Sequence, residues 1–422
     1  MASAILHIKD SYYFEVPKKL WPVTHGSKSA FPGLWIRLDK DFQRWEAERL
    51  YDDYSRLSES VRDGSPFELR SFAEINADYE DWKHDGHSNA GKPFYRFLEE
   101  AEYVLENGKH GGDKEWFTHK LESSGFRERW SEAKEQAGDV RAYRNDSAII
   151  WSADKVNAYN KNLSGKILIP QYFGKLRNFH EPESGLCISK FMIIEVIVAL
   201  LLWAVFSWLG RQVGDGARPR GRIWNLLESF VVFIRDEVAR PAIGKHDADR
   251  FVPLLLTLFF FVLGCNLSGM LPWVGAPTGA FGATLGLALV TFGTVIVFGM
   301  LKFGPLGFFL NQIPSMDLPL ALAILLKPMI LAIELLGMLI KHGVLAVRLL
   351  ANMVAGHVVL LGIMTLAFSV EGAMSNTWLI TAPICVVGST LISCLELFVA
   401  FLQAYIFTFL SALFIGAAIH HH

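Results

Sequence analysis

The chain changes character near residue 190. From there to the C-terminus, long apolar runs alternate with short polar connections, whereas the preceding part mixes charged and aromatic residues. An apolar run of about 20 residues is long enough to cross the hydrocarbon core of a bilayer as a helix. The pattern predicts five spans, at Lys190–Gly210, Phe251–Leu271, 281–301, within Asp317–Val370, and at Trp378–Ile415.

The last two apolar segments exceed a single perpendicular span. As one helix, residues 317–370 would be about 80 Å long, against about 30 Å of hydrocarbon. No charged turn divides this segment before Glu371, although Pro328, Gly337 and Gly343 permit kinks. We therefore predict an all-α, polytopic membrane protein whose last two helices are long and tilted.

The polar connections predict how the chain is oriented. Residues 222–240 alternate charged and apolar positions, which is typical of an amphipathic helix lying in the membrane interface. The preceding loop is rich in arginine, and the positive-inside rule predicts that such a loop is cytoplasmic. Its arginines are Arg211, Arg218, Arg220 and Arg222. The N-terminal region would then lie outside the cytoplasm, in the periplasm of a bacterium, and the C-terminus would be cytoplasmic.

The N-terminal region holds most of the charge. Residues 1–189 carry 58 of the 82 Lys, Arg, Asp and Glu residues, so we expect a soluble region there and a membrane-embedded domain over residues 190–422. Within it, aromatic and aliphatic residues recur at helical spacings amid charges. The predicted helices are Leu38–Val61, Pro66–Trp82, Pro93–Leu105 and Trp116–Ala137. These would form an extracytoplasmic helical insertion over about residues 23–163.

Composition excludes several classes of function. The net charge is −2 with no basic patch, which argues against nucleic acid as a partner. The four cysteines form no CxxC pair, so we expect neither a metal site nor a disulfide. The run from Gly86 to Lys92 has phosphate-loop spacing, but Pro93 replaces the Ser or Thr that would bind magnesium. The N-terminus resembles neither a secretory signal nor a transit peptide, which favours a bacterial source over a mitochondrial inner membrane protein.

Charged residues inside the long apolar segment are the strongest functional signal. Arg348 cannot lose its charge in a protein, and at bilayer depth it costs about 2.5–3.5 kcal/mol on insertion scales. Glu334, Lys341, Arg348 and Asn352 fall within about 80° of helical arc, whereas His357 faces the opposite way. Glu334 and Arg348 are about 21 Å apart along a continuous helix, so Lys341 is the expected partner of Glu334.

The last apolar segment carries a matching polar face. Ser389, Glu396 and Gln403 are spaced by seven residues and therefore share one side of a helix. A carboxylate in line with an amide and a hydroxyl suits the passage of water and protons through a membrane.

These motifs together resemble subunit a of F-type ATP synthases, the stationary proton-channel subunit beside the rotating ring of c subunits. The run from Arg348 to His357, Arg-Leu-Leu-Ala-Asn-Met-Val-Ala-Gly-His, looks like the signature of that family. Asn266, Gly269 and Pro272 match its Asn-Leu-x-Gly-x-x-Pro pattern, and the run from Glu396 to Thr408 matches its last helix. The resemblance covers about residues 190–418 and leaves residues 23–163 unexplained.

The resemblance implies a non-catalytic subunit without cofactors that couples proton flow to rotation and to ATP synthesis or hydrolysis. It implies two aqueous half-channels, the outer one lined by His357 and Glu396, with Gln403 near the essential Arg348. Glu334 is our candidate for the inner half-channel, where Lys341-His342 departs from the Arg-Pro of many relatives. The implied partners are the c-subunit ring, the b subunits of the peripheral stalk, the rest of the complex and the lipid bilayer. Coupling by sodium ions instead of protons is equally compatible with these motifs.

Two other functions compete with this interpretation. A secondary transporter would bind an anionic substrate at Arg348, but it would predict internal repeats, which the sequence lacks. A membrane-anchored binding protein would leave Arg348, His357 and Glu396 unexplained.

Overall fold

The computed structural model describes residues 10–59, 71–84, 92–100, 103–104, 110–111, 124–176, 179–180, 182–214, 221–271, 274–312, 320–369 and 376–419. The chain divides into two compact units. One comprises Met1–Glu15, Ile167–Tyr172 and Ile188–His422, and the other comprises Val16–Lys166 and Phe173–Cys187.

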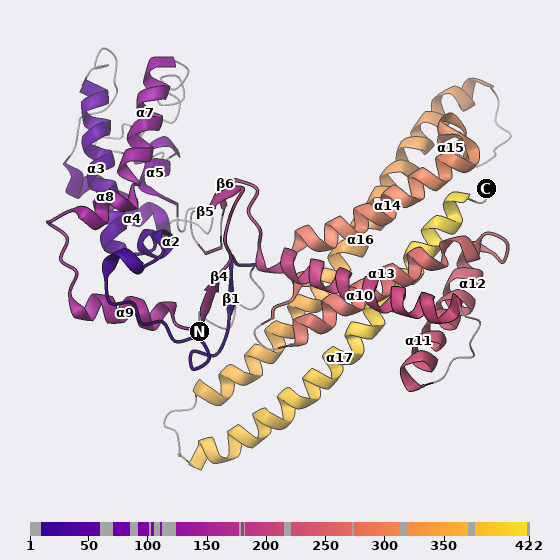
Figure 1. Ribbon diagram of the computed structural model, residues 1–422. Coiled ribbons are helices and arrows are strands. Elements are labelled where there is room, and N and C mark those ends of the chain that lie inside the picture. Colours follow the sequence, from indigo (N-terminus) through magenta and orange to yellow (C-terminus); the bar gives the residue numbers. More distant parts are fainter. Residues whose placement is uncertain are drawn as a thin grey trace. The chain divides into compact units, whose positions relative to one another are not determined.

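The described part of the first unit contains five helices that are long and apolar enough to cross a membrane (Figure 1), which confirms the predicted all-α polytopic fold. They are α10 (Lys190–Gly214), α13 (Ala248–Met270), α14 (Phe281–Phe303), α16 (Leu320–Ser369) and α17 (Asn376–Ile419). With 50 and 44 residues, α16 and α17 are about 75 and 66 Å long, so the prediction of helices far longer than the bilayer is thick is also confirmed.

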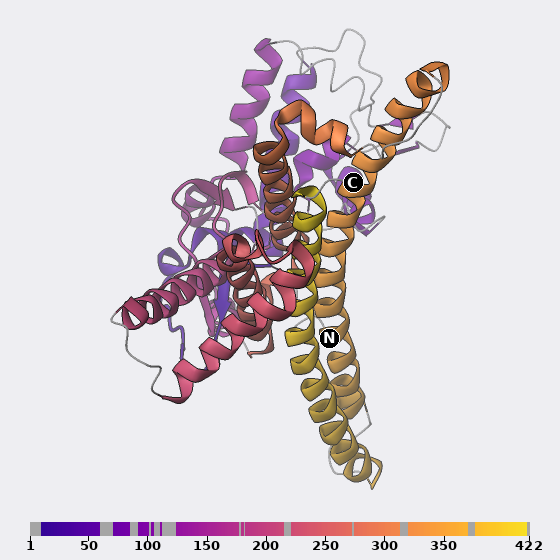
Figure 2. The ribbon, with the colours of Figure 1, turned by 90° about the vertical axis from the view of Figure 1, so that its right-hand side faces the viewer.

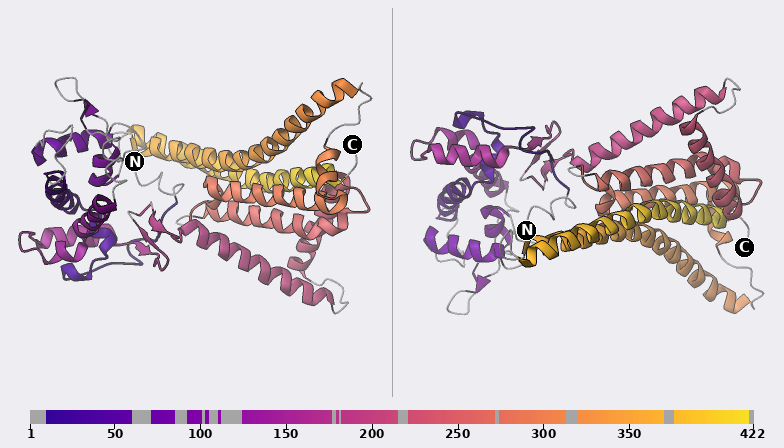
Figure 3. Two further views of the ribbon diagram at one scale, coloured as in Figure 1. Left: turned by 90° about the horizontal axis from the view of Figure 1, so that it is seen from above. Right: turned by 90° about the horizontal axis from the view of Figure 1, so that it is seen from below.

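The two longest helices lie side by side along much of their length, as Figures 2 and 3 show from different directions. Helix α13 packs against α17 and contributes Leu255, Phe259 and Val262 to the core of this unit. Helix α17 contributes Phe407 and Ala412 to the same core. Burial of these apolar side chains between helices fixes which face of α16 and α17 turns inward.

A polar segment connects α10 to α13. It consists of α11 (Arg222–Phe233), a π-helical turn η2 (Ile234–Ala239) and α12 (Arg240–Ile243). Ile234 and Val238 are fully buried, whereas Arg235 and Arg240 both form ion pairs with Asp236, at 3.0 and 2.6 Å. The hydrogen bond from Arg235 holds the pKa of the Asp236 carboxyl below its usual value. The predicted amphipathic helix over residues 222–240 is thus confirmed, with one face apolar and the other charged.

Short elements complete the first unit. They are the strand β1 (Tyr13–Glu15), which pairs with β4 (Lys166–Leu168), the turn η3 (Pro277–Gly279) and α15 (Pro305–Asn311). The N-terminal segment covers the start of α10, because the Lys190 amide donates to the Ser11 carbonyl (2.8 Å) and the Phe191 amide donates to Asp10 (3.3 Å). Orphan amides at the helix N-terminus are satisfied in this way.

The second unit is mainly helical. Its elements are η1 (Lys28–Ala30), α2 (Gly33–Arg37), α3 (Lys40–Glu59), α4 (Phe72–His84), α5 (Phe94–Glu100), α7 (Ser124–Ala137), α8 (Val140–Asn145) and α9 (Ala153–Leu163), with strands β2 (Tyr103–Val104), β3 (His110–Gly111), β5 (Gly174–Leu176) and β6 (Pro182–Gly185). Leu50, Phe97 and Trp130 are buried at its centre, and the Trp130 indole donates to Glu99 at 2.9 Å.

The predicted helices of the insertion match α3, α4, α5 and α7, with one correction. The sequence predicts helix to Leu105, but α5 ends at Glu100, and Tyr103 and Val104 pair with Gly111 and His110 as a small antiparallel ribbon. Aromatic and β-branched residues favour strands, and glycine permits the close pairing of the ribbon. The ends predicted at Val61, Pro66, Leu105 and Trp116 lie outside the described residues.

Candidate functional site

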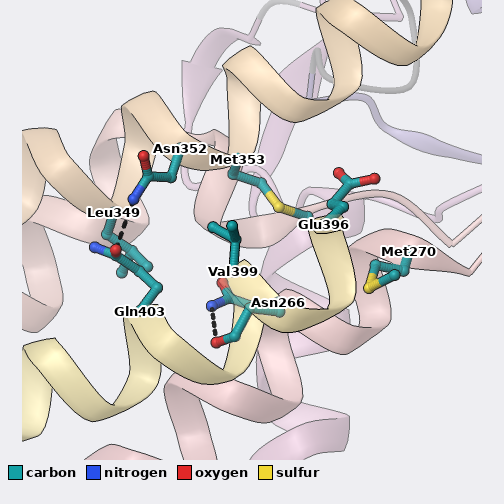
Figure 4. Close-up of a pocket in the computed structure, with 9 residues that line it drawn as sticks. Asn266, Met270, Leu349, Asn352, Met353, Glu396, Val399 and Gln403 are labelled. Carbon is teal, nitrogen blue, oxygen red and sulfur yellow. Dashed lines mark hydrogen bonds between the residues drawn. The ribbon is translucent and has the colours of Figure 1, made fainter. Parts of the chain in front are cut away.

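The candidate site lies where α16, α17 and α13 meet (Figure 4). Because α16 and α17 run antiparallel, their polar residues meet in pairs at successive depths. From the sequence, the members of each pair are predicted only as residues on the polar faces of two separate helices. The structure shows two such pairs whose side chains are in contact.

The first pair joins Asn352 to Gln403. The Asn352 amide donates to the Gln403 carbonyl oxygen at 2.6 Å, as the dashed line in Figure 4 marks. Gln403 is only 2% exposed. Asn352 is one helical turn from Arg348, so this bond ties the two helices together next to the arginine.

The second pair joins His357 to Glu396. The imidazole Nδ1 lies 2.7 Å from the carboxylate Oε1, and the two side chains are only 16% and 11% exposed. On its other side, the imidazole Nε2 lies 3.1 Å from the Gly269 carbonyl oxygen of α13. Glycine at position 356 leaves room for the carboxylate, since a Cβ there would lie 3.0 Å from Glu396 Oε1.

This arrangement can hold one proton between the two side chains. A carbonyl oxygen only accepts, so Nε2 of His357 carries a hydrogen. The close Nδ1–Oε1 contact is favourable only if a further proton lies between the two atoms. That proton resides either on the ring, as an imidazolium beside a carboxylate, or on the carboxyl group beside a neutral ring. The pair can therefore accept and release a proton while the surrounding helices stay in place.

The motif on α13 supports both pairs. Asn266 is 3% exposed, donates to the Ala400 carbonyl of α17 (3.3 Å) and accepts from Thr278 (2.8 Å), so it hydrogen-bonds from α13 to a neighbouring helix. A Cβ on Gly269 would lie 2.0 Å from the Met353 methyl group and 2.7 Å from Ala276 Cβ, so this glycine does permit close helix approach. Pro272 lies outside the described residues.

A small cavity opens between the two pairs. It offers about 20 Å³ of room, which is enough for about one water molecule. Its lining residues are Asn266, Met270, Leu349, Asn352, Met353, Glu396, Val399, Ala400 and Gln403. In Figure 4 the amides of Asn352 and Gln403 lie at one end of this cavity and the Glu396 carboxylate at the other. The lining combines a carboxylate with amides that can hydrogen-bond water.

Arg348 lies beside this cluster on α16. It is half-buried, and among the residues that the structure describes it forms no ion pair. Fourteen residues earlier on the same helix, Glu334 pairs with Lys341 at 3.5 Å, so the predicted partner of Glu334 is confirmed. The half-exposed Glu334 and Lys341 remain accessible on the outside of the helix pair, and the arginine is left with its charge available for a group outside this chain.

The structure also shows that His342, to which the sequence analysis assigns no role, is buried in the helix bundle. His342 is 3% exposed, its Nδ1 contacts the Met338 carbonyl at 2.8 Å, and its ring packs between Phe292 of α14 and Phe414 of α17. The helical period could have predicted this burial, because His342 shares a face with the buried Leu345, Leu349 and Met353. Within the described ranges, no three His, Cys, Asp or Glu side chains are close enough together to bind a metal ion.

Comparisons with known proteins agree on the membrane-embedded part of the chain. The family model described as ATP synthase A chain matches residues 191–416. ATP synthase subunit a of Myxococcus xanthus is 40% identical over 240 residues, which is 56% of this chain and 75% of that protein. ATP synthase subunit a 2 of Chlorobaculum tepidum is 36% identical over 254 residues, 59% of this chain and 68% of that protein. ATP synthase subunit a of Chlorobium phaeobacteroides is 34% identical over 291 residues, 68% of this chain and 77% of that protein.

Proposed function

The chain belongs to the ATP synthase subunit a family and is the proton-translocating subunit a of an F-type ATP synthase, and on this premise we propose which of its residues move protons. It is a channel component of that complex and a multi-pass protein of the bacterial inner membrane. The observation that carries the proposal is the contact between His357 and Glu396 on neighbouring helices.

Protons reach this pair through the outer half-channel. The single proton held between His357 and Glu396 passes from the outer aqueous phase toward a carboxylate on a neighbouring c subunit. Water in the adjoining cavity is oriented by the amides of Asn352, Gln403 and Asn266. This water extends proton transfer beyond the reach of the His357 and Glu396 side chains.

Arg348 separates the two half-channels. Its permanent charge attracts the deprotonated carboxylate of the rotor and repels a proton that would otherwise pass directly between the half-channels. Its lack of an ion pair with any described residue supports this role, because an arginine already neutralised within its own chain would attract the rotor less strongly.

The inner half-channel is lined by Glu334. This carboxylate is 42% exposed on α16, so water can reach it and carry a proton that the rotor releases to the cytoplasm. Each proton crossing 100 mV yields about 2.3 kcal/mol, so a ring must collect several protons for each ATP made elsewhere in the complex. We propose that the chain itself is non-catalytic.

The arginine-rich loop between α10 and α11 faces the cytoplasm. The N-terminal region is then periplasmic and the C-terminus cytoplasmic. We assign the c-subunit ring and the b subunits as its neighbours within the complex. The insertion over residues 23–163 contacts an accessory protein or a neighbouring complex outside the membrane, a role motivated by its aromatic residues; deleting residues 30–160 without effect on assembly, oligomeric state or activity would contradict it.

Acidification of inverted membrane vesicles tests the mechanism. ATP-driven pumping by Arg348→Ala should vanish at matched assembly, while ATP hydrolysis by detached catalytic heads survives. The matched control is Lys327→Ala, which removes an exposed cation from the same helix 21 residues away, outside the Glu334–Lys341 pair, and should keep measurable pumping. Pumping by Arg348→Ala at the wild-type rate would show that the arginine is structural.

A further inference from the structure

Glu195 is an acidic residue inside the first membrane span. It lies in the apolar run of α10, five residues after Lys190, and its side chain is partly buried. Among the residues that the structure describes, it forms no hydrogen bond or ion pair. A carboxylate within a span costs free energy unless something offsets it, so such an acid indicates a path for ions or protons.

The side chain of Glu195 lies on the face of α10 that turns toward the other helices. Glu195 shares this face with Phe191, Ile194 and Val198, at spacings of three and four residues. Phe191 and Ile194 are only 2% and 4% exposed, whereas Val196 on another face is 57% exposed. The carboxylate is therefore directed toward the helix bundle and not toward lipid.

Two close contacts show which part of α13 lies beside Glu195. A Cβ on Gly264 of α13 would lie 2.7 Å from Val198 Cγ1. A Cβ on Gly275, five residues after α13 ends, would lie 2.9 Å from Lys190 Nζ. The two helices therefore run antiparallel. Because Glu195 lies between Lys190 and Val198 along α10, it lies beside the last two turns of α13.

These turns of α13 carry a hydrogen bond that leads to the cavity of the candidate site. Asn266 lies two residues after Gly264 and accepts from the Thr278 hydroxyl of η3 at 2.8 Å. The two side chains are 3% and 1% exposed. Asn266 also lines the cavity that the Glu396 carboxylate reaches from α17. Polar groups therefore extend from the outer end of α13 to Glu396.

The outer end of α10 is charged. Asp10 accepts from the Phe191 amide at 3.3 Å and interacts electrostatically with both Lys190 and Glu195. The segment with Asp10, both helices and η3 belong to the same compact unit. Five residues of helix span about 7.5 Å, so Glu195 lies less than two turns below this charged end. The carboxylate is thus close to the outer aqueous phase.

We propose that Glu195 is the entrance of the outer half-channel, where it takes up protons from the aqueous phase and passes them on toward Glu396. This inference rests on the proposed function of His357 and Glu396. Outer water gives a proton to the Glu195 carboxylate, and the neutral acid gives it to the next water on the path. Water beside Thr278 and Asn266 carries the proton between the two carboxylates, and Glu195 returns to its ionised form after each transfer.

Two substitutions separate proton transfer from packing. Glu195→Gln keeps the size and polarity of the side chain but has no acidic proton, whereas Glu195→Asp keeps the acid and is shorter by one methylene. ATP-driven acidification of inverted vesicles is compared at matched assembly. We expect Glu195→Gln to pump about tenfold more slowly or worse, because a positioned acid–base group contributes about 10²–10⁴ in rate and water partly replaces one at an entrance.

The aspartate variant should keep most of the pumping. Wild-type pumping by Glu195→Gln would overturn the proposal. Equal losses in the two variants, or a loss confined to Glu195→Asp, would show that the side chain serves packing and would overturn it as well.

Access of water to position 195 gives a second measurement that does not depend on pumping. The complete complex, with its native cysteines replaced by serine, carries Glu195→Cys or the control Val196→Cys on the adjacent, lipid-facing position. A membrane-impermeant methanethiosulfonate, which reacts with hydrated thiols, is added from the outer side of right-side-out vesicles. We expect labelling several-fold faster at position 195 than at position 196. Equal labelling, as for a side chain that only reaches the interface, or slower labelling at position 195 would overturn the entrance.

The two proposals fail in different ways. If Arg348→Ala and His357→Ala do not pump but Glu195→Gln pumps normally, the entrance is wrong and the proposed function stands. If Arg348→Ala pumps at the wild-type rate, the proposed function fails and the entrance fails with it.

Discussion

The imidazole of His357 on α16 lies 2.7 Å from the carboxylate of Glu396 on α17, and both side chains are largely buried. Each side chain is thus the other's principal polar partner across the helix interface. Replacing one of them leaves the remaining group buried without its partner, which is why each single substitution should impair proton transfer strongly.

We expect His357→Ala and Glu396→Ala each to lower ATP-driven pumping about a hundredfold or more, since a positioned acid–base group contributes about 10²–10⁴ in rate. The exchange variant His357→Glu/Glu396→His keeps one acid and one imidazole at the same contact and should recover part of the activity. Pumping rates at matched assembly measure this, and an exchange variant no better than the single variants would show that the two positions are not equivalent.

The bond between Asn352 and Gln403 should stabilise the helix pair measurably. Asn352→Leu leaves the Gln403 amide buried without a partner, at a cost of about 1–3 kcal/mol, and Gln403→Leu does the same to Asn352. The double variant removes both groups and should cost less than the sum of the single variants. A double-mutant cycle from thermal unfolding of the assembled complex measures the coupling, and strictly additive effects would mean that the bond does not contribute.

Gly269 should not tolerate even one additional methyl group. Its Cβ would collide with Met353 and Ala276, so Gly269→Ala should destabilise the bundle by about 1–3 kcal/mol and displace the carbonyl that accepts from His357. Gly293→Ala is the matched control, because a Cβ on this glycine of α14 meets no atom within 4 Å. The control should be neutral or slightly stabilising, since alanine favours helix over glycine by about 1 kcal/mol.

The insertion offers a test that depends on pH. The Tyr159 hydroxyl donates to Asp39, whose carboxylate also lies 2.9 Å from the Lys155 ammonium. Burial and the neighbouring Asp39 raise the pKa of Tyr159 above its usual value of 10.0. A raised pKa in the folded state contributes stability that is fully present below about pH 10 and lost as the pH rises further. Tyr159→Phe should therefore be less stable than the wild type by about 1–2 kcal/mol between pH 7 and 9, with a smaller difference above pH 10. Pulse proteolysis of the α9 region in the purified complex measures this, and a pH-independent difference would contradict the bond to Asp39.

The membrane helices could be predicted because each is a long, mostly apolar run. The polar stripe of α16 could be predicted because a single helix fixes the angles between its residues. The sequence therefore predicted the Glu334–Lys341 pair, which lies within one helix. Contacts between helices depend on the relative depth of the two helices in the bundle, and the periodicity within one helix does not determine that depth. The contacts from Asn352 to Gln403 and from His357 to Gly269 are of this kind. The end of α5 was predicted wrongly because the ribbon from Tyr103 to Gly111 is stabilised by pairing between residues, not by periodicity along one segment.

Substitutions of His342 show whether this histidine is a core residue or carries protons. Its Nε2 is buried with no hydrogen-bond partner among the residues that the structure describes, and its ring centroid lies 5.1 Å from that of Phe292 and 4.8 Å from that of Phe414. His342→Phe fills nearly the same space and removes the unpaired nitrogen, so we expect the stability to change by less than about 1.5 kcal/mol and pumping to persist. His342→Ala leaves a cavity between the two phenyl rings and should cost about 2–5 kcal/mol. Thermal unfolding and vesicle acidification of both variants check this. If His342→Phe assembles normally but does not pump, the histidine takes part in proton transfer, and the inner half-channel extends into the helix bundle.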